Sequence, residues 1–418
     1  MSPSAPRFDV AIYMPLAAGH YRRSGPVGGG AELQTVLLAR ALAARGVRVA
    51  HIVFPVEDLA PAIPPSPSLI ERAPDRGDVP LIGSAAEALN IWRSMADADA
   101  AVYLFRTGRS RLLVGAMFCQ AHRRKLVFAG ANDLDFAFDE KRSIHSPTRG
   151  YRAALRRTDA IVAQTEHQLG LVRQGLGKDH RATRIPSFVE PSAPATREPD
   201  GFIWIGRLMP YKQPLEYVRL AEALPDRRFR MVFEEGEDDP EEDRAVSRRM
   251  VAELRSAARR LPNLELIGQV RRDRVLHLIE RSFAVVSTST HEGMPNVFLE
   301  AWARAVPVLS FQCDPGGQIK ARAAGRTAGG SHRELVRIAD LVSRDQSLRR
   351  QLGGNGRRYV NQVHDPVAVG NQWMTLFDEL LESSESRLGV PAAQRTQGEA
   401  ASVASLRLGG PHTVADSD

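Results

Sequence analysis

The fold of this chain is decided by one stretch, Ser287-Thr288-Ser289-Thr290-His291-Glu292-Gly293-Met294-Pro295-Asn296-Val297-Phe298-Leu299-Glu300-Ala301, which joins an apolar strand to a helix through a glycine-containing turn. The pattern predicts a buried strand that ends at the carboxyl edge of a sheet, and a helix in which Pro295 takes the first position. The first N–H groups of a helix have no partner within it, so they attract phosphate and donate to hydroxyl groups. In this turn those groups belong to Gly293, Met294, Asn296 and Val297.

The same stretch holds two carboxylates apart. Glu292 lies in the turn and Glu300 lies more than one helical turn beyond it, so the two can contact different parts of one extended ligand. A glutamate near a helix N-terminus can also act only on the helix dipole, and for Glu300 alone that explanation would often suffice. Its occurrence together with Glu292, the turn and two cations elsewhere favours a binding site. For His291, a local structural contact is favoured over a ligand contact.

The two cations follow another buried strand. Residues 202–205 are Phe-Ile-Trp-Ile, and Arg207 and Lys212 come directly after them, on either side of Pro210. Arginine offers a planar fork of donors and lysine a compact charge, so the pair can neutralise negative charge that develops on a departing phosphate.

Short apolar runs alternate along the chain with segments long enough for helices, which predicts α/β structure with parallel sheets. The expected strands are 8–14, 47–54, 100–105, 126–129 and 160–164 in one series, and 202–205, 229–233, 264–267, 283–287 and 306–311 in a second. A polar, proline-rich stretch at 191–199 separates the series. We therefore predict two domains, 1–190 and 200–365, a helix at 366–382, and a disordered tail at 383–418.

Taken together, these motifs resemble glycosyltransferase family 4. The Arg207 and Lys212 pair and the two spaced glutamates occur in the family's order, and the segment Gly28-Gly29-Gly30-Ala31-Glu32 before an apolar helix is similar to its first loop. The resemblance covers roughly residues 8–382. It implies two facing Rossmann-like domains, the GT-B architecture, and a retaining transfer of a sugar from a nucleoside diphosphate sugar.

The resemblance also implies roles for individual residues. Glu300 would accept hydrogen bonds from the ribose, Arg207 and Lys212 would hold the diphosphate, and backbone at Gln269 and Val270 would contact the base. Glu292 and the N–H groups after it would bind the sugar, without Glu292 acting as a covalent nucleophile. Gly28, Gly29 and Gly30 would let backbone approach the phosphate or the acceptor when the domains close. The leaving phosphate itself would help to deprotonate the acceptor.

The chain departs from the family after the fourth strand, where many relatives carry a histidine. Here Asn132, Asp133 and Asp135 occupy that region, and we take Asn132 and Asp133 as candidate substrate-binding residues. The Asp133-Leu134-Asp135 spacing would suit a metal, but it lies in the domain opposite the nucleotide. No zinc-type cysteine spacing or His-Glu-x-x-His motif occurs, so no metal and no cofactor are expected.

Composition adds limits on partners and location. The formal net charge is +7, with basic residues gathered at Arg106, Arg109, Arg111, Arg123, Arg124 and Lys125. A solvated face is favoured over an anionic acceptor or membrane surface, and nucleic acid is least favoured because no aromatic residues alternate with the charges. No membrane span or signal peptide is recognisable, so we expect a cytoplasmic protein, with a peripheral contact at the inner face of the membrane left open. Cys119 and Cys313 should both be reduced.

Two other kinds of function remain open at this point. A phosphorylase or a sugar-nucleotide epimerase can share the same architecture, because a fold does not set its reaction. The chain could also be a non-catalytic protein that binds a sugar nucleotide for a partner. The presence of both carboxylates and both cations favours the enzyme. The base, the sugar and the acceptor are not determined by these residues.

Overall fold

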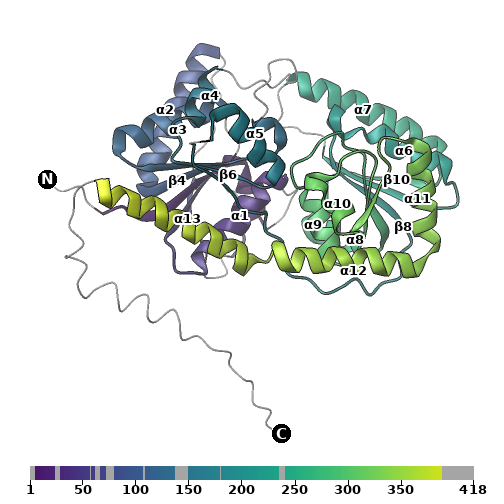
Figure 1. Ribbon diagram of the computed structural model, residues 1–418. Coiled ribbons are helices and arrows are strands. Elements are labelled where there is room, and N and C mark those ends of the chain that lie inside the picture. Colours follow the sequence, from purple (N-terminus) through teal and green to yellow (C-terminus); the bar gives the residue numbers. More distant parts are fainter. Residues whose placement is uncertain are drawn as a thin grey trace, which may run out of the picture. The chain divides into compact units, whose positions relative to one another are not determined.

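The computed structural model describes residues 5–23, 29–56, 58–61, 66–71, 80–106, 109–136, 149–178, 180–234 and 241–387. Within them the chain forms two all-parallel sheets, each with helices on it (Figure 1). The predicted class, α/β with two parallel sheets, is confirmed. Gly28 and residues 388–418 of the predicted tail lie outside the described residues.

The first sheet has the strand order β3-β2-β1-β4-β5-β6-β7. Its strands are β1 (Phe8–Tyr13), β2 (Val49–Val53), β3 (Ser68–Glu71), β4 (Ala100–Arg106), β5 (Lys125–Ala129), β6 (Ala160–Ala163) and β7 (Ala182–Arg184). The helical segments between them are η1 (Pro15–Tyr21), α1 (Gly30–Ala43), α2 (Pro80–Ala98), α3 (Arg109–His122), η2 (Asp133–Phe136), α4 (Arg149–Leu155) and α5 (Glu166–Leu176).

The second sheet has the order β10-β9-β8-β11-β12-β13. Its strands are β8 (Gly201–Arg207), β9 (Phe229–Glu234), β10 (Leu264–Ile267), β11 (Ser282–Ser287), β12 (Val308–Ser310) and β13 (Gly325–Thr327). Its helical segments are η3 (Pro210–Lys212), α6 (Pro214–Ala223), α7 (Glu241–Arg260), α8 (Arg272–Glu280), α9 (Asn296–Ala303), η4 (Pro315–Gly317), α10 (Gln318–Ala321), α11 (His332–Arg344) and α12 (Gln346–Val363), and α13 (Pro366–Arg387) follows.

All ten predicted strands form, and the three that were missed share one property. β3, β7 and β13 each lie at an edge of a sheet. An edge strand has a neighbour on one side only, and β3 and β7 contain no fully buried residue. Such strands carry no continuous apolar run, so hydrophobic pattern does not reveal them.

Apolar clusters on each sheet fix the strand ends. On the first sheet, Tyr13 stacks on Phe105 with ring centroids 4.7 Å apart. On the second, Phe202 stacks on Phe229 at 5.2 Å in one cluster, and Trp302 of α9 is fully buried in another. Each such side chain contributes about 1.5–3 kcal/mol when it leaves water. This packing holds the loops at the carboxyl ends of the strands in place.

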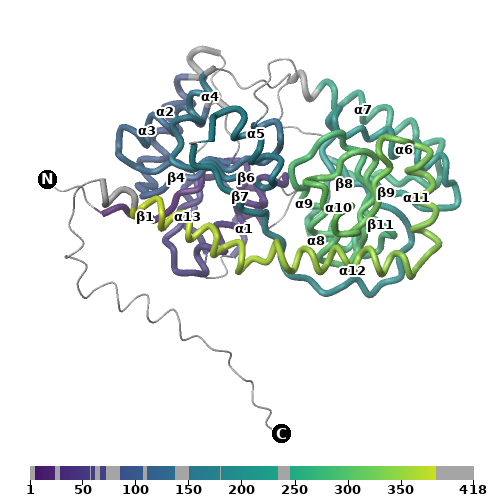
Figure 2. The backbone as a smooth tube through the Cα atoms, viewed as in Figure 1, coloured from purple at the N-terminus to yellow at the C-terminus, as the bar shows by residue number. Residues whose placement is uncertain are grey.

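Polar contacts link the beginning of the chain to its later part. Arg45, just after α1, donates from Nη2 to the carbonyl of Val367 at 2.8 Å and from Nε to Oδ1 of Asn371 at 3.2 Å. The start of α13 therefore lies beside the end of α1, as the backbone trace in Figure 2 shows. Helix α13 continues to Arg387, beyond the boundary at residue 382 that the sequence predicts.

Candidate active site

The candidate site is built on the carboxyl ends of β8 and β11, which are neighbours in the second sheet. The loops after them are joined by hydrogen bonds. Thr290 N donates to Tyr211 O at 2.8 Å, and Trp204 Nε1 donates to Thr288 Oγ1 at 2.9 Å. Because of these bonds, the predicted segment 207–212 lies beside the predicted turn at Glu292.

Lys212 and Glu292 form an ion pair in this structure. The ammonium group contacts Oε1 of Glu292, which also accepts from Ser289 Oγ at 2.7 Å. Burial alone would lower the pKa of Lys212, but the Glu292 carboxylate raises it above its usual value, so the lysine stays charged. Arg207, by contrast, is exposed at the end of β8. Ser289 was not identified from the sequence.

Glu300 forms the second pair of the site. Its Oε1 contacts Nη1 of Arg272, the first residue of α8, whose Nη2 lies 3.2 Å from Oε2 of Glu190. Burial raises the pKa of Glu300, against the opposing effect of Arg272. The sequence did not identify Arg272, because this pairing joins residues 28 apart on two different helices.

The helix after the turn begins one residue later than predicted. α9 starts at Asn296, so Pro295 precedes the first helical residue instead of occupying it. The Asn296 side chain contacts α1, where Nδ2 donates to Gly30 O at 2.6 Å and Oδ1 accepts from Gln34 Nε2 at 3.0 Å. Gly29 lies directly before α1 in extended conformation. The structure thus brings Gly30 and Asn296 together, two predicted residues that are far apart in the sequence.

Gly293 faces the carboxyl edge of the first sheet. A Cβ atom on Gly293 would lie 2.7 Å from Nε2 of Gln168, 2.8 Å from the amide end of Gln164 and 3.0 Å from Ala131 O. A side chain at this position would force the two glutamine amides and the Ala131 carbonyl to shift, which favours glycine on steric grounds. Met294, next to it, is buried, and Val297 is half-buried against the apolar cluster that holds Trp302.

Gln164 and Arg106 form a buried polar contact behind Gly293. When the Gln164 amide is oriented by its hydrogen bonds, its oxygen accepts from Ser187 Oγ at 2.8 Å and from Nη2 of Arg106, and its nitrogen donates to Ala131 O at 3.1 Å. Arg106 ends β4 and is buried, and burial lowers its pKa to about 10. In the described part of the chain Nε of Arg106 has no hydrogen-bond partner. In the sequence, Arg106 is recognisable only as part of a basic cluster.

The segment after β5 supplies a third group of candidates. Oδ2 of Asp135 accepts from Ala131 N at 2.7 Å and from Asn132 N at 3.0 Å, so this carboxylate shapes the turn. Burial raises the pKa of Asp133, and Oδ2 of Asp133 lies 3.8 Å from Nε2 of His167. Asp133 and Asp135 therefore serve different contacts. In the residues that the structure describes, no three metal-ligating side chains converge.

The remaining predicted residues follow the carboxyl ends of strands in the second sheet. Gln269 is exposed and Val270 half-buried after β10. His291 stacks on Tyr211 with ring centroids 4.7 Å apart, and its Nδ1 lies 2.9 Å from Thr290 Oγ1. The local contact expected for His291 is present. Its Nε2 is buried without a hydrogen-bond partner in the described residues.

Part of the basic cluster of the first half is neutralised by nearby carboxylates. Arg111 Nε lies 2.7 Å from Glu87, Arg124 Nη2 lies 2.6 Å from Asp99, and Lys125 Nζ lies 3.2 Å from Asp159. Such exposed or half-buried pairs reduce the net field of the face. Among the described helices, none has both the length and the apolar character needed to cross a membrane.

Comparison with known proteins agrees with this geometry. Residues 192–359, which hold the second sheet, match the family model described as glycosyl transferases group 1. Sucrose-phosphate synthase of Thermosynechococcus elongatus superimposes with a TM-score of 0.72 over 90% of this chain and 100% of its own, at 16% identity. The Anabaena protein HepE, solved with UDP-glucose, gives 0.67 over 90% of this chain and 100% of its own, at 17% identity. The chain has the GT-B fold.

The sequence of a curated protein matches a shorter region of this chain. The "Glycosyltransferase 1 domain-containing protein 1" of Xenopus tropicalis is 28% identical over 125 residues, which is 30% of this chain and 36% of the relative. The match therefore spans about a third of that protein's length.

Proposed function

We propose that the protein is a retaining glycosyltransferase of family 4 type, which transfers a sugar from a nucleoside diphosphate sugar to an acceptor. The observation that carries this proposal is the pair of carboxylate–cation contacts, Lys212 with Glu292 and Arg272 with Glu300, at one edge of the second sheet. The match to the glycosyltransferase group 1 model and the likeness to HepE, which binds UDP-glucose, support it.

The two carboxylates are arranged for hydroxyl groups at two ends of one ligand. In the described part of the chain, the side-chain contacts of Glu292 and of Glu300 go to Oε1 in both residues. Each Oε2 is then an acceptor for a ligand hydroxyl. We assign the ribose to Glu300 and the donor sugar to Glu292. The N–H groups at the start of α9 add donors for the same ligand.

The two cations would act on the leaving group. As the bond to the anomeric carbon breaks, negative charge grows on the diphosphate, and in this proposal Arg207 and Lys212 stabilise it. Lys212 would exchange part of its contact with Glu292 for the phosphate, which leaves Glu292 free to hold the sugar. The departing phosphate oxygen then takes the proton of the acceptor hydroxyl. No covalent intermediate on Glu292 is part of this proposal.

The test compares Glu300→Ala with Glu292→Ala. The nucleotide is first chosen by a thermal-shift screen of UDP, GDP, ADP and TDP, because a ligand that binds the folded state raises its melting temperature. Glu300→Ala should weaken binding of the nucleoside diphosphate in isothermal titration, since the ribose loses its acceptor. Glu292→Ala should bind the diphosphate as wild type does, yet transfer the sugar much more slowly.

The matched control is Glu334→Ala, which removes an exposed carboxylate of α11. Reversed effects of the two variants would reverse the assignment of the ligand's ends. Wild-type binding and rates in both variants would refute a glycosyltransferase site here. Product analysis with donor alone and with phosphate separates transfer from epimerisation and phosphorolysis.

We further propose that transfer needs no metal, since two cationic side chains and a helix N-terminus would neutralise the diphosphate in the proposed binding mode. Transfer assayed with EDTA should keep most of its rate. Complete loss on chelation, restored by magnesium or manganese, would contradict this and would make Asp133 the first residue to examine as a ligand.

A further inference from the structure

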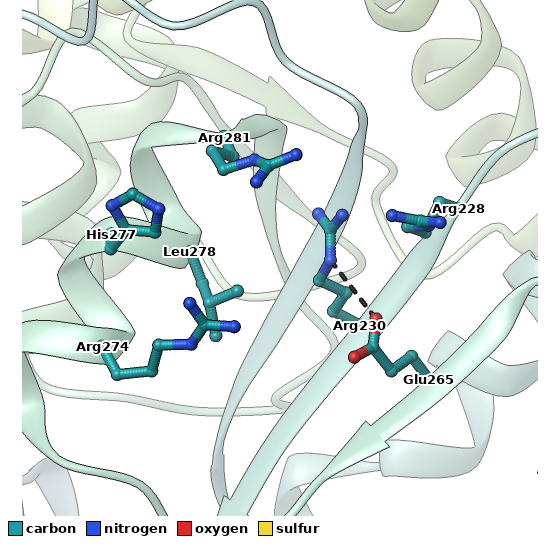
Figure 3. A pocket seen from close by; sticks show the side chains of 7 residues that line it. All are labelled: Arg228, Arg230, Glu265, Arg274, His277, Leu278 and Arg281. Carbon is teal, nitrogen blue, oxygen red and sulfur yellow. Dashed lines mark ion pairs between the residues drawn. The ribbon is translucent and has the colours of Figure 1, made fainter.

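A polar cavity lies at the amino edge of the second sheet, opposite the candidate active site. Its volume is about 130 Å³, and it is lined by Arg228 and Arg230 of β9 and its approach, Glu265 of β10, and Arg274, His277, Leu278 and Arg281 of α8 and its end (Figure 3). The β-strands are parallel, so this edge lies away from Glu292 and Glu300, which follow the carboxyl end of β11.

The residue spacing on β9 and on α8 explains why these side chains lie close together. Arg230 and Val232 lie on one face of β9 because strand side chains alternate, and Val232 packs in the apolar cluster that also holds Leu278 of α8. On α8, Arg274, Leu278 and Arg281 are spaced by four and three residues, so they share one face of the helix. The basic side chains Arg274 and Arg281 therefore lie on the side of α8 that faces the start of β9.

Existing ion pairs account for only part of this charge. Asp200, before β8, accepts from Arg230 at 2.8 and 2.7 Å and from Arg281 at 2.8 Å, and it lies 3.6 Å from Arg228. Glu265 Oε2 lies 3.5 Å from Nε of Arg230, the contact drawn in Figure 3. Arg230 is almost fully buried, with 5% of its side chain exposed, and these two carboxylates satisfy it.

Arg274 and His277 have no such partner. Within the described ranges, no carboxylate forms an ion pair with either side chain, although both line the cavity. Four guanidinium groups and two carboxylates leave a formal charge of +2 around one small volume, before any proton on His277. Like charges held this close repel one another, and an anion with several acceptor oxygens would remove that repulsion.

We propose that this cavity binds a phosphate dianion, either as free phosphate or as the phosphate group of a small phosphomonoester. A guanidinium group donates two parallel hydrogen bonds to phosphate, and arginines converging from a strand and a helix can contact different oxygens of one anion. The small volume and the polar lining fit a compact tetrahedral anion with any attached group extending outward. This site is independent of the proposed glycosyl transfer.

The test is isothermal titration of the full chain with inorganic phosphate, glycerol 3-phosphate and a hexose 6-phosphate, at constant ionic strength maintained with sodium chloride. The wild type should bind at least one of them, and the double variant Arg274→Ala/His277→Ala should bind it at least tenfold more weakly. Arg274 is exposed on a helix, where alanine is favourable, so the variant should fold as judged by its melting curve. Tighter binding of free phosphate than of both esters would identify the free ion as the ligand, and the reverse a monoester.

Two further variants separate this cavity from the candidate active site. Arg333→Ala removes an exposed arginine of α11 outside the cavity and should bind phosphate as the wild type does. Arg207→Ala should also bind it normally. No binding to the wild type at millimolar concentration would overturn the proposal, as would binding that Arg207→Ala loses and the double variant keeps.

Discussion

The carboxyl edges of the two sheets differ in how they hold charge. On the second sheet, cations and carboxylates are paired side by side, Lys212 with Glu292 and Arg272 with Glu300. On the first, Arg106 is buried and is contacted by the neutral amide of Gln164, and no described carboxylate forms an ion pair with it. Under the proposed function, the paired charges of the second edge would hold a ligand that has both hydroxyl groups and negative charge. The first edge offers neutral hydrogen bonds around the buried Arg106, and its ion pair of Arg184 with Glu166 is made by exposed side chains.

The largest effect is expected on the second edge, from removal of a cation. Arg207→Ala should lower kcat by on the order of a hundredfold, because in the proposed mechanism the arginine stabilises charge that appears only as the diphosphate leaves. The melting temperature should hardly change, since Arg207 is exposed. Lys212→Ala should lower both rate and stability, because it leaves the Glu292 carboxylate without its cation.

Initial rates with the full donor and thermal melts of the same samples check this prediction. The control is Arg219→Ala, whose side chain is 59% exposed on α6 and forms an ion pair with Glu216 of the same helix. Near-normal kcat in both cation variants would contradict a catalytic role for these cations. The paired charges of the second edge would then only stabilise the structure.

A smaller effect is expected where the two edges touch, at Gly293. A methyl group there would meet Gln168, Gln164 and Ala131, so Gly293→Ala should displace the turn that carries Glu292. A displacement of about 1 Å in a catalytic group can lower kcat/KM by up to about a hundredfold, and we expect a tenfold or larger loss.

The matched control for Gly293→Ala is Gly170→Ala in α5, where the added carbon meets nothing within 4 Å. That change should raise stability by about 0.5–1 kcal/mol, because alanine is the better helix former, and should leave rates unchanged. The measurement is kcat/KM of both variants under the same conditions. Full activity in Gly293→Ala would show that the turn moves freely away from the first edge.

The same contrast explains what the sequence could predict. On the second edge, Glu292 and Glu300 lie on one strand–turn–helix unit, and Arg207 and Lys212 on another, so local pattern was enough to identify them. Arg272 was missed because it reaches Glu300 from a different helix through tertiary packing. Hydrophobic runs found each strand with two neighbours, whereas half-exposed edge strands such as β7 gave no such signal.

The first edge was harder because its polar residues come from separate strands. Arg106 ends β4, Gln164 follows β6 and Ser187 follows β7, and only the parallel sheet brings them together. None belongs to a motif of fixed spacing, and glutamine and serine are common in solvated loops. The sequence therefore indicated where this edge lies, through Asn132 and Asp133, but not the contact between Arg106 and Gln164.

The smallest effect is expected in the dependence of stability on pH, and it bears on the first edge. His364 supports that edge, because its Nδ1 donates to Ser187 O at 2.7 Å, while Nε2 lies 3.1 Å from the Tyr359 hydroxyl and accepts from it. Ser187 in turn contacts Gln164. Burial lowers the pKa of His364 to about 4 from the usual 6.5, so the folded protein holds this ring neutral.

The sign follows from proton uptake. Between about pH 6.5 and 4 the unfolded chain binds a proton at this position and the folded chain does not, so the free energy of unfolding falls as the pH falls through that window. The slope is at most about 1.4 kcal/mol per pH unit for one group. Glu300, whose pKa is raised, acts in the opposite direction, and a variant is therefore needed to isolate the effect of the histidine.

His364→Asn should lower the free energy of unfolding at pH 7.5. Between pH 7 and 5, urea unfolding should show a smaller decrease of that free energy in the variant than in the wild type. An unchanged slope in His364→Asn would mean that the neutral first edge does not depend on this buried ring.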